Sequence, residues 1–187
     1  NATFIGPRWT VLHGYTSHRM SKTILITGAG TGIGKDTAFA LAQRGHQVLA
    51  TTQTEAQALT LKQAASEQGL RLEAFKLDIT LAEDRALLSQ HAIDVLINNA
   101  AMGESGSLAE VDMQRVRQLF EVNLFATLEL TQVALRQMIE RESGTVLFIS
   151  SIAGRVPMPF LMPYSMSKFA LSAAAAGLRA EMDQLKK

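Results

Sequence analysis

The feature that most constrains this chain is a glycine-rich turn between a short apolar run and an alanine-rich run. The turn reads Thr27-Gly28-Ala29-Gly30-Thr31-Gly32-Ile33-Gly34. The preceding residues 23–26 are rich in β-branched side chains and too few for a helix, so we predict a strand there. Residues 35–44 have a helical composition and end at Gly45, a residue suited to a helix C-cap. The glycines therefore lie at a strand-to-helix turn.

Such a turn can hold a phosphate, because glycine lets the backbone approach a ligand and the first N–H groups of the helix can bind an anion. Gly28, Gly32 and Gly34 are spaced G-x-x-x-G-x-G, with Gly30 in addition, which departs from the usual G-x-G-x-x-G. A flexible loop is the alternative interpretation. The flanking strand and helix favour a dinucleotide-binding turn over it.

Composition excludes several classes of function. The chain has 187 residues and a formal net charge of +1, with scattered charges, so we expect neither nucleic acid nor a membrane surface as a partner. Cysteine is absent and the four histidines are isolated from one another, so we expect no metal site. No apolar run is long enough to cross a bilayer, and we expect a cytoplasmic protein.

The first residues differ in character from the rest. Residues 1–19 mix Pro, Gly, His, Trp and Arg without a period, whereas Met20-Ser21-Lys22 leads directly into the first predicted strand. We therefore expect residues 1–19 to be an appended or upstream-translated segment, with a functional N-terminal arm as the alternative. Residues 20–187 are expected to form one domain.

Beyond the first helix, short apolar runs alternate with helical patterns. We predict strands at residues 47–51, 72–77, 94–97 and 145–149. We predict helices at residues 55–68, 81–91, 113–142 and from 164 to the end. This alternation predicts a parallel sheet covered by helices on both faces. Ligands bind to such sheets at the carboxyl ends of the strands, where the distinctive residues of this chain fall.

Tyr164 and Lys168 open the last predicted helix at positions i and i+4, so their side chains share a face. A free phenol is a weak acid at neutral pH, and a neighbouring ammonium favours its ionised form. By itself the pair could be two chance surface residues. Its position, directly after the fifth strand and its loop, favours an acid–base role.

Two further residues are candidates for the same site. Ser151 ends the fifth predicted strand, where its hydroxyl could bond a substrate oxygen; the alternative is a loop serine bonded to its own backbone. Asn123 falls within the apolar stripe of helix 113–142, where a buried amide needs partners. That amide could hold a water beside Lys168, or it could mark a kinked position or bond nearby backbone. The apolar stripe comprises Val116, Leu119, Phe120, Leu124 and Leu128.

Together these motifs resemble those of the short-chain dehydrogenase/reductase family. The resemblance covers about residues 22–187 and rests on the glycine turn, Asp78, Asn98-Asn99-Ala100-Ala101, Asn123, Ser151 and Tyr164-Ser165-Met166-Ser167-Lys168. It implies a Rossmann-like, doubly wound, three-layer α/β/α fold. It also implies a catalytic tetrad of Asn123, Ser151, Tyr164 and Lys168. The family separates its serine and tyrosine by thirteen positions, which selects Ser151 over Ser150.

The resemblance assigns a role to each residue. Tyr164 is the general acid in carbonyl reduction and the base in alcohol oxidation, and Ser151 orients the substrate oxygen. Lys168 binds the nicotinamide ribose and helps Tyr164 to ionise, and Asn123 anchors a water of the proton relay. The hydride comes from the nicotinamide. The implied cofactor-binding residues are Gly28, Gly30, Thr31, Gly32, Ile33, Gly34, Thr51, Asp78, Ile79, Asn99, Ala100, Tyr164 and Lys168.

The end of the second strand bears on the choice of cofactor. An acidic residue there would bond the ribose 2′-hydroxyl and repel a 2′-phosphate, but this chain has Thr51-Thr52-Gln53. Lys35 can add positive charge nearby. Thr31 and Gln53, however, stand where many NADP-using relatives carry basic residues. We predict NADP(H) rather than NAD(H), chiefly because the acid is missing.

Family members usually continue for roughly another sixty residues, which gives a total length typical of α/β domains. The resemblance therefore predicts a truncated domain that ends after the sixth helix, or else a short natural variant, with poor cofactor binding and little turnover. It also implies a homodimer or homotetramer through the long and last helices, with packing onto the sheet as the alternative. The predicted function is an NADP(H)-dependent oxidoreductase that interconverts a small-molecule carbonyl and an alcohol. A catalytically silent NAD(P)-sensing protein, or an interaction form that pairs with longer chains, is the alternative.

Overall fold

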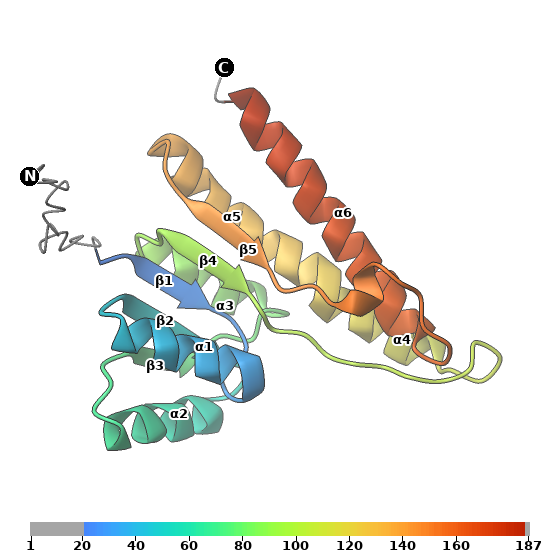
Figure 1. The fold of residues 1–187 in the computed structure, drawn as a ribbon, viewed down its shortest axis with the longest axis horizontal. Coiled ribbons are helices and arrows are strands. Elements are labelled where there is room, and N and C mark those ends of the chain that lie inside the picture. The colour runs from blue at the N-terminus through green and yellow to red at the C-terminus, as the bar shows by residue number, and fades with distance from the viewer. Residues whose placement is uncertain (1–20, 186–187) are drawn as a thin grey trace, which may run out of the picture.

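The computed structural model describes residues 21–185 (Figure 1). The expectation for residues 1–19 concerns residues outside this part of the chain. Five parallel strands form one sheet in the order β3-β2-β1-β4-β5. The strands are β1 (Thr23–Ile26), β2 (Gln47–Thr52), β3 (Glu73–Lys76), β4 (Val95–Asn98) and β5 (Thr145–Phe148). The doubly wound parallel sheet predicted from the sequence is confirmed.

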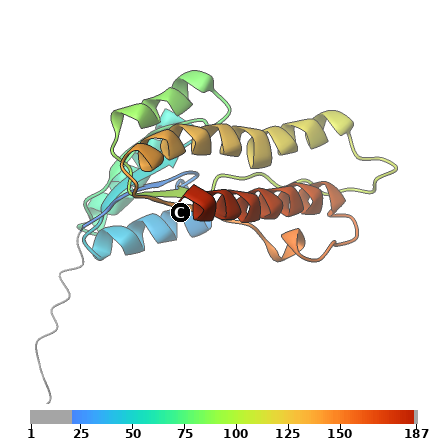
Figure 2. The same cartoon turned by 90° about the horizontal axis from the view of Figure 1, so that it is seen from above.

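Helices cover both faces of this sheet. They are α1 (Gly32–Gln43), α2 (Glu55–Glu67), α3 (Ala82–Ala86), α4 (Met113–Phe120), α5 (Thr127–Glu140) and α6 (Met162–Leu185). Short 3₁₀ segments, η1 (Leu87–Gln90) and η3 (Ile152–Gly154), follow α3 and β5. Seen from above, α1 and α6 lie on one face, and α3, α4 and α5 lie on the other (Figure 2).

The central strand shows why its sequence does not alternate between apolar and polar residues. Leu25 enters an apolar cluster with Leu130 of α5, whereas Ile24 and Ile26 enter a second cluster with Phe39 of α1. All three strand side chains are almost fully buried. A strand covered on both faces must be apolar at every position.

Two predicted helices are less regular than expected. Residues predicted as helix 81–91 form α3 and then a 3₁₀ turn, and residues predicted as helix 113–142 contain a π-helical segment, η2 (Glu121–Ala126), between α4 and α5. A π segment carries one extra residue per turn, which a periodicity argument does not detect. The hydroxyl of Thr127 donates to the carbonyl of Val122, five residues earlier, within this segment (3.0 Å).

Other boundaries differ by one or two residues, and α6 begins at Met162 rather than at residue 164. Among residues 21–185, β5 pairs with β4 alone, and the side chain of Leu147 on this outer strand is 46% exposed. No helix within the same residues is both long enough and apolar enough to cross a membrane.

Candidate active site

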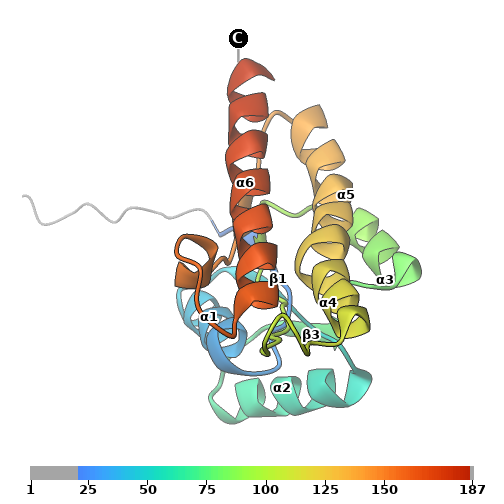
Figure 3. The ribbon, with the colours of Figure 1, turned by 90° about the vertical axis from the view of Figure 1, so that its right-hand side faces the viewer.

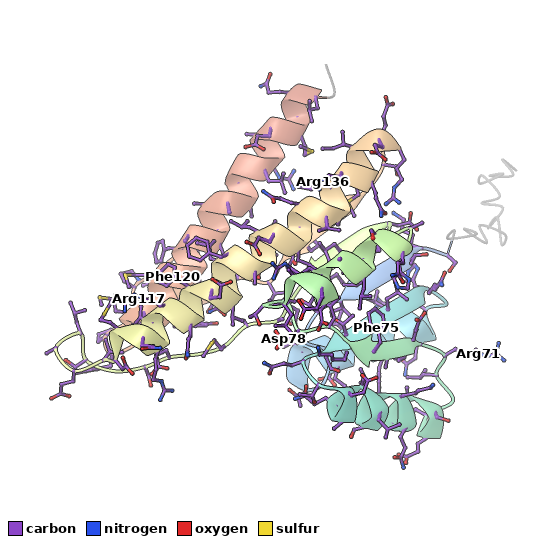
Figure 4. The ribbon with its side chains drawn as sticks, turned by 180° about the vertical axis from the view of Figure 1, so that it is seen from behind. Arg71, Phe75, Asp78, Arg117, Phe120 and Arg136 are labelled. Carbon is purple, nitrogen blue, oxygen red and sulfur yellow. The ribbon has the colours of Figure 1, made fainter. Side chains whose placement is uncertain are left out.

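The predicted site residues gather at the carboxyl edge of the sheet, because the parallel strands are in register. The glycine turn follows β1, Asp78 follows β3, Asn99 follows β4 and Ser151 follows β5. Figure 4 shows Asp78 and Arg71 at opposite ends of β3, with Asp78 on the site edge. The structure thus brings together segments that are far apart in the sequence.

The glycine turn folds tightly against the end of β4. A Cβ atom on Gly28 would lie 2.8 Å from the Cα of Ala100, and one on Gly34 would overlap the carbonyl oxygen of Gly28. The side-chain amide of Asn99 donates to the carbonyls of Thr27 (2.9 Å) and Gly28 (3.1 Å). Asn99 therefore holds the turn in place, and glycine is required where the two segments touch.

Thr27 is a residue that the sequence argument did not assign to the site. Its side chain is buried, and its hydroxyl oxygen accepts from the backbone N–H groups of Asn99 (3.0 Å) and Ala100 (2.9 Å). It is thus the partner of Asn99 in joining β1 to β4. Sequence reasoning missed this role because a threonine at the end of a strand is common, and only the position of β4 identifies its partners.

The same turn is open on its outer side. Gly32 has φ of +53°, and a Cβ added there would meet nothing within 4 Å. Thr31 precedes α1 without bonding its first N–H groups through the side chain, and Ile33 is 68% exposed. Free N–H groups at an open helix start can bind a pyrophosphate, so these residues fit the dinucleotide predicted from the sequence.

The end of β2 presents one polar side chain to solvent. Thr51 is fully buried, and its hydroxyl donates to the carbonyl of Ile26 in β1 (3.3 Å). Thr52 is also buried, and its methyl group lies 3.6 Å from the Cβ position of Gly30. Gln53 is exposed. Contact of Thr51 with a cofactor stays a prediction, and Gln53 is the more accessible side chain.

Asp78 connects this corner to β3. One carboxylate oxygen accepts from the N–H (2.9 Å) and the hydroxyl (2.7 Å) of Thr80, and the other accepts from the amide of Gln53 (3.2 Å). Partial burial raises the pKa of Asp78, but the bonds from Thr80 and Gln53 and the charge of Lys76 outweigh it, so the pKa lies below its ordinary value. The next residue, Ile79, is buried in the core.

Lys168 is the most unusual residue of the site. It is 3% exposed, and its ammonium donates to the backbone carbonyl of Ile149 at the end of β5 (2.9 Å). Within residues 21–185 it belongs to no ion pair. Burial lowers the pKa of Lys168. Its Nζ lies 5.7 Å from the centre of the Tyr164 ring, so the two side chains share a face of α6, as the spacing predicts.

Asn123 lies in the π segment and is buried, as the apolar stripe predicts. Its Oδ1 accepts from the N–H of Met102 (2.8 Å), and its Nδ2 donates to the carbonyl of Met102 (2.9 Å) and to the hydroxyl of Ser167 (3.0 Å). Both amide hydrogens are therefore used by protein acceptors. Most of these bonds join the amide to nearby backbone, which is one of the alternatives considered in the sequence analysis. The role of Asn123 in anchoring a water stays a prediction.

Ser167 is the second residue that sequence reasoning missed. It is fully buried, and its hydroxyl donates to the carbonyl of Tyr164 (2.8 Å) while it accepts from Asn123. It therefore connects the π segment to the turn of α6 that carries Tyr164 and Lys168. The signal in the sequence was its place inside the Tyr164–Lys168 motif, but its long-range partner is visible only in the fold.

The two adjacent serines have different partners. The hydroxyl of Ser150 pairs with that of Ser172 (2.8 Å) and donates to the carbonyl of Lys168 (3.3 Å). The hydroxyl of Ser151 accepts from the N–H of Ala153 (3.1 Å), and its own hydrogen has no acceptor among the described residues 21–185. Ser151 therefore bonds the nearby backbone, which is the alternative considered in the sequence analysis. Its hydroxyl hydrogen is still available to a ligand.

The segment after β5 presses against α6. A Cβ on Gly154 would lie 2.7 Å from both the carbonyl oxygen of Lys168 and the hydroxyl oxygen of Ser150. Ser151 thus lies between Ile149 and Gly154, both of which contact Lys168. Among residues 21–185 no cluster of His, Cys, Asp and Glu could hold a metal ion.

A five-stranded parallel sheet with a glycine turn after its central strand is a Rossmann-like fold. The family model described as short chain dehydrogenase matches residues 22–186, so the chain belongs to the short-chain dehydrogenase family. Dehydrogenase/reductase SDR family member 7B of Mus musculus is 33% identical in an alignment 171 residues long, which covers 86% of this chain and 53% of that protein. Ketoacyl reductase HetN of a Nostoc species is 33% identical in an alignment 167 residues long, which covers 86% of this chain and 58% of that protein.

Solved structures agree with this assignment. A short-chain dehydrogenase from Streptomyces avermitilis has a TM-score of 0.81 and 32% identity, covering 90% of this chain and 63% of that one. A gluconate 5-dehydrogenase from Burkholderia cenocepacia, in complex with NADP and tartrate, has a TM-score of 0.80 and 28% identity, covering 88% and 67%. The chain spans little more than half the length of the first two relatives named above.

Proposed function

We propose that the site belongs to an NADP(H)-dependent oxidoreductase that interconverts a carbonyl and an alcohol of a small molecule. The observation that carries the proposal is the buried ammonium of Lys168 beside the ring of Tyr164, with the free donor of Ser151 on the adjoining segment. A buried ammonium with one protein acceptor is costly, and it gains from a ligand that brings further acceptors. The hydroxyls of a ribose are such acceptors.

Each residue then has a defined task. Tyr164 exchanges a proton with the substrate oxygen, and Ser151 donates a hydrogen bond that orients that oxygen. Lys168 donates to ribose hydroxyls and stabilises the ionised phenol. Asn123, through Ser167, holds the turn of α6 that carries both residues, and we propose that it also anchors a water of the proton relay. The nicotinamide, when bound, supplies the hydride.

The open glycine turn supports a pyrophosphate at the start of α1, contacted by Gly30, Thr31, Gly32 and Ile33. At the corner beyond it, Asp78 and Ile79 would lie against the adenine. NADP(H) is favoured because no acid ends β2, and because three of the similar solved structures are described as containing NADP or NADPH. Gln53, the exposed residue of this corner, is then placed to bond a 2′-phosphate.

The assembly is proposed from family likeness, and the location from the sequence. We expect a homodimer or homotetramer formed through α4–α5 and α6, on which Phe125 and Phe169 are 52% and 40% exposed. Sedimentation that detects only monomer would contradict this. We expect a cytoplasmic protein.

The test combines turnover with binding. NADPH absorbance is followed with a panel of carbonyl compounds, for the wild type and for Tyr164→Phe. We expect Tyr164→Phe to lower turnover by about 10²–10⁴-fold, the usual contribution of a positioned acid, while NADPH binding is retained. Equal turnover of the two proteins would reject Tyr164 as the acid.

Two further results separate the alternatives. NADPH binding without turnover of any carbonyl would favour the silent sensing protein over the enzyme. Titration of both cofactors measures the preference directly, and tighter binding of NADH than of NADPH would reject the predicted cofactor.

A further inference from the structure

The loop that joins the two proposed catalytic residues Ser151 and Tyr164 is almost entirely apolar. Its twelve residues, 152–163, read Ile-Ala-Gly-Arg-Val-Pro-Met-Pro-Phe-Leu-Met-Pro. Arg155 is the one polar side chain among them. Loops at the surface are usually polar, because their side chains face water. An apolar loop at this place therefore needs an explanation.

Four of its large apolar side chains face solvent. Ile152 is 75% exposed, Val156 56%, Met158 44% and Phe160 71%. Burial of a side chain of this size contributes about 1.5–3 kcal/mol, and the fold leaves much of that contribution unused here. Single exposed apolar residues are ordinary, but four within nine positions form a patch, and patches of this kind mark binding sites.

The backbone of Phe160 adds a second observation. Its φ is +58°, in the left-handed region that bulky residues rarely adopt, at a cost of about 1–2 kcal/mol. Its carbonyl accepts from the N–H of Gly106 (2.8 Å), which joins this loop to the one that follows β4. A strained residue at a site is a recognised pointer to function.

The partner loop exposes one large apolar side chain among polar ones, which include Ser105 and Glu110. Leu108 is 66% exposed, while Glu104, whose side chain is mostly buried, is paired with Arg115 (2.8 Å). Figure 3 shows the two loops at the same end of the molecule, beside the starts of α4 and α6. The start of α6 carries Tyr164, and the partner loop begins at Met102, which Asn123 holds. The exposed apolar residues therefore lie on the segments that directly adjoin Ser151, Tyr164 and Met102 in the chain.

We propose that the substrate of this site is an uncharged ketone, or its alcohol, with an extended apolar chain that lies against Ile152, Val156, Met158, Phe160 and Leu108. This inference rests on the proposed function and adds the substrate class. The reacting oxygen faces Ser151 and Tyr164, and the hydrocarbon portion covers the patch. Reduction transfers a hydride from NADPH to the carbonyl carbon and a proton from Tyr164 to its oxygen, which yields the alcohol and NADP⁺.

The first experiment is a series of ketone substrates of increasing chain length. The substrates are 2-butanone, 2-hexanone, 2-octanone and 2-decanone, with a keto acid matched to 2-octanone in length. We expect kcat/KM to rise about two- to fourfold per added methylene, the value of burying that group. A flat series, or a preference for the keto acid, would overturn the inference.

The second experiment alters the patch without disturbing the fold. Phe160→Asn removes the apolar ring, and asparagine tolerates the left-handed conformation better than phenylalanine does. We expect about a tenfold lower kcat/KM for 2-decanone and a change within twofold for 2-butanone. The matched control is Leu59→Asn, at a position of α2 that is 69% exposed, and it should change neither value.

Other results have equally definite meanings. If Phe160→Asn changes the sedimentation of the protein and not its chain-length dependence, the patch is an interface between copies and the inference is wrong. Turnover of 2-butanone without any dependence on chain length overturns the substrate class alone. Failure of every ketone together with absence of NADPH binding overturns the proposed function, and the substrate class with it.

Discussion

The two halves of the site edge are built in different ways. The half formed by β1 and α1 depends on backbone contacts, in which Gly28 and Gly34 touch neighbouring segments more closely than a side chain allows. The half formed by β5 and α6 depends on side-chain hydrogen bonds between distant segments, as in the series Met102, Asn123, Ser167 and Tyr164. A single substitution in the first half should therefore cause a large loss of stability. Single substitutions in the second half should each cause a smaller loss.

Gly34→Ala should have the largest effect, because its Cβ would overlap the carbonyl of Gly28 and lie 2.5 Å from the amide nitrogen of Asn99. We expect a loss of about 3 kcal/mol in the free energy of unfolding, measured by urea denaturation, together with loss of NADPH binding. Gly177→Ala is the matched control. A Cβ there meets nothing within 4 Å inside α6, so it should add about 0.5–1 kcal/mol. Similar stability of the two variants would contradict the claim that close backbone contacts hold the β1–α1 half together.

Asn123→Leu tests the other half at its most connected residue. The substitution leaves the N–H and carbonyl of Met102 without their side-chain partner, and it removes the donor to Ser167. We expect a loss of about 2–3 kcal/mol in unfolding free energy, with turnover reduced at temperatures where the protein stays folded. Gln118→Leu, at an exposed position of α4, serves as the control and should change stability by less than about 0.5 kcal/mol. A wild-type unfolding curve for Asn123→Leu would contradict the proposed link.

The adjacent serines sharpen the comparison within the second half. Ser150→Ala removes the bond to Ser172 and should lower the unfolding free energy by about 1 kcal/mol while turnover changes little. Ser151→Ala removes the acceptor of the Ala153 N–H, so the unfolding free energy should also fall, by about 0.5–1 kcal/mol. Turnover of Ser151→Ala should fall by about 100-fold, as for other donors to a reacting oxygen. If steady-state kinetics show a large loss of turnover for Ser150→Ala and little change for Ser151→Ala, Ser150 is the residue that orients the substrate oxygen.

Lys168→Met should have a small, stabilising effect and the clearest dependence on pH. Burial lowers the pKa of Lys168 below its ordinary 10.5, so the unfolded chain binds this proton more tightly than the folded one. The unfolding free energy of the wild type therefore increases as the pH rises from the lowered pKa of Lys168 to 10.5. The difference in unfolding free energy between Lys168→Met and the wild type should become smaller over that range.

At pH 7 we expect Lys168→Met to be about 1 kcal/mol more stable than the wild type by urea denaturation, and to bind NADPH at least tenfold more weakly. Lys62→Met, at an exposed position of α2, should change neither value. If the difference in unfolding free energy between the two proteins does not vary with pH, burial does not lower the pKa of Lys168, and the prediction is wrong.

Sequence reasoning was most accurate where local chemistry decides the structure. The five strands, the glycine turn and the shared face of Tyr164 and Lys168 all follow from periodicity and spacing, and the structure confirms them. It was less accurate where packing decides. The π segment at residues 121–126 was predicted as ordinary helix, because one extra residue in a turn hardly disturbs an apolar stripe.

The partners of buried polar groups could not be predicted for the same reason. Thr27 and Ser167 are common residue types at ordinary positions, and their importance comes from Asn99 and Asn123, which reach them from segments 72 and 44 residues away in the sequence. The choice between Ser150 and Ser151 rested on spacing within the family. The structure supplies a physical reason, since α6 engages the hydroxyl of Ser150 and leaves the donor of Ser151 free.

The sequence by itself determined the alternation of strands and helices, the glycines that must lie at one turn and the positions of the candidate catalytic side chains, because these depend on neighbours along the chain. Only the tertiary structure decided which hydroxyls and amides are already bonded, that the ammonium of Lys168 is buried, and that the loop from Ser151 to Tyr164 leaves its apolar side chains exposed. Those properties depend on segments that are distant in the sequence. Such segments come into contact only when the helices pack onto the sheet, and that packing determines burial and hydrogen bonding.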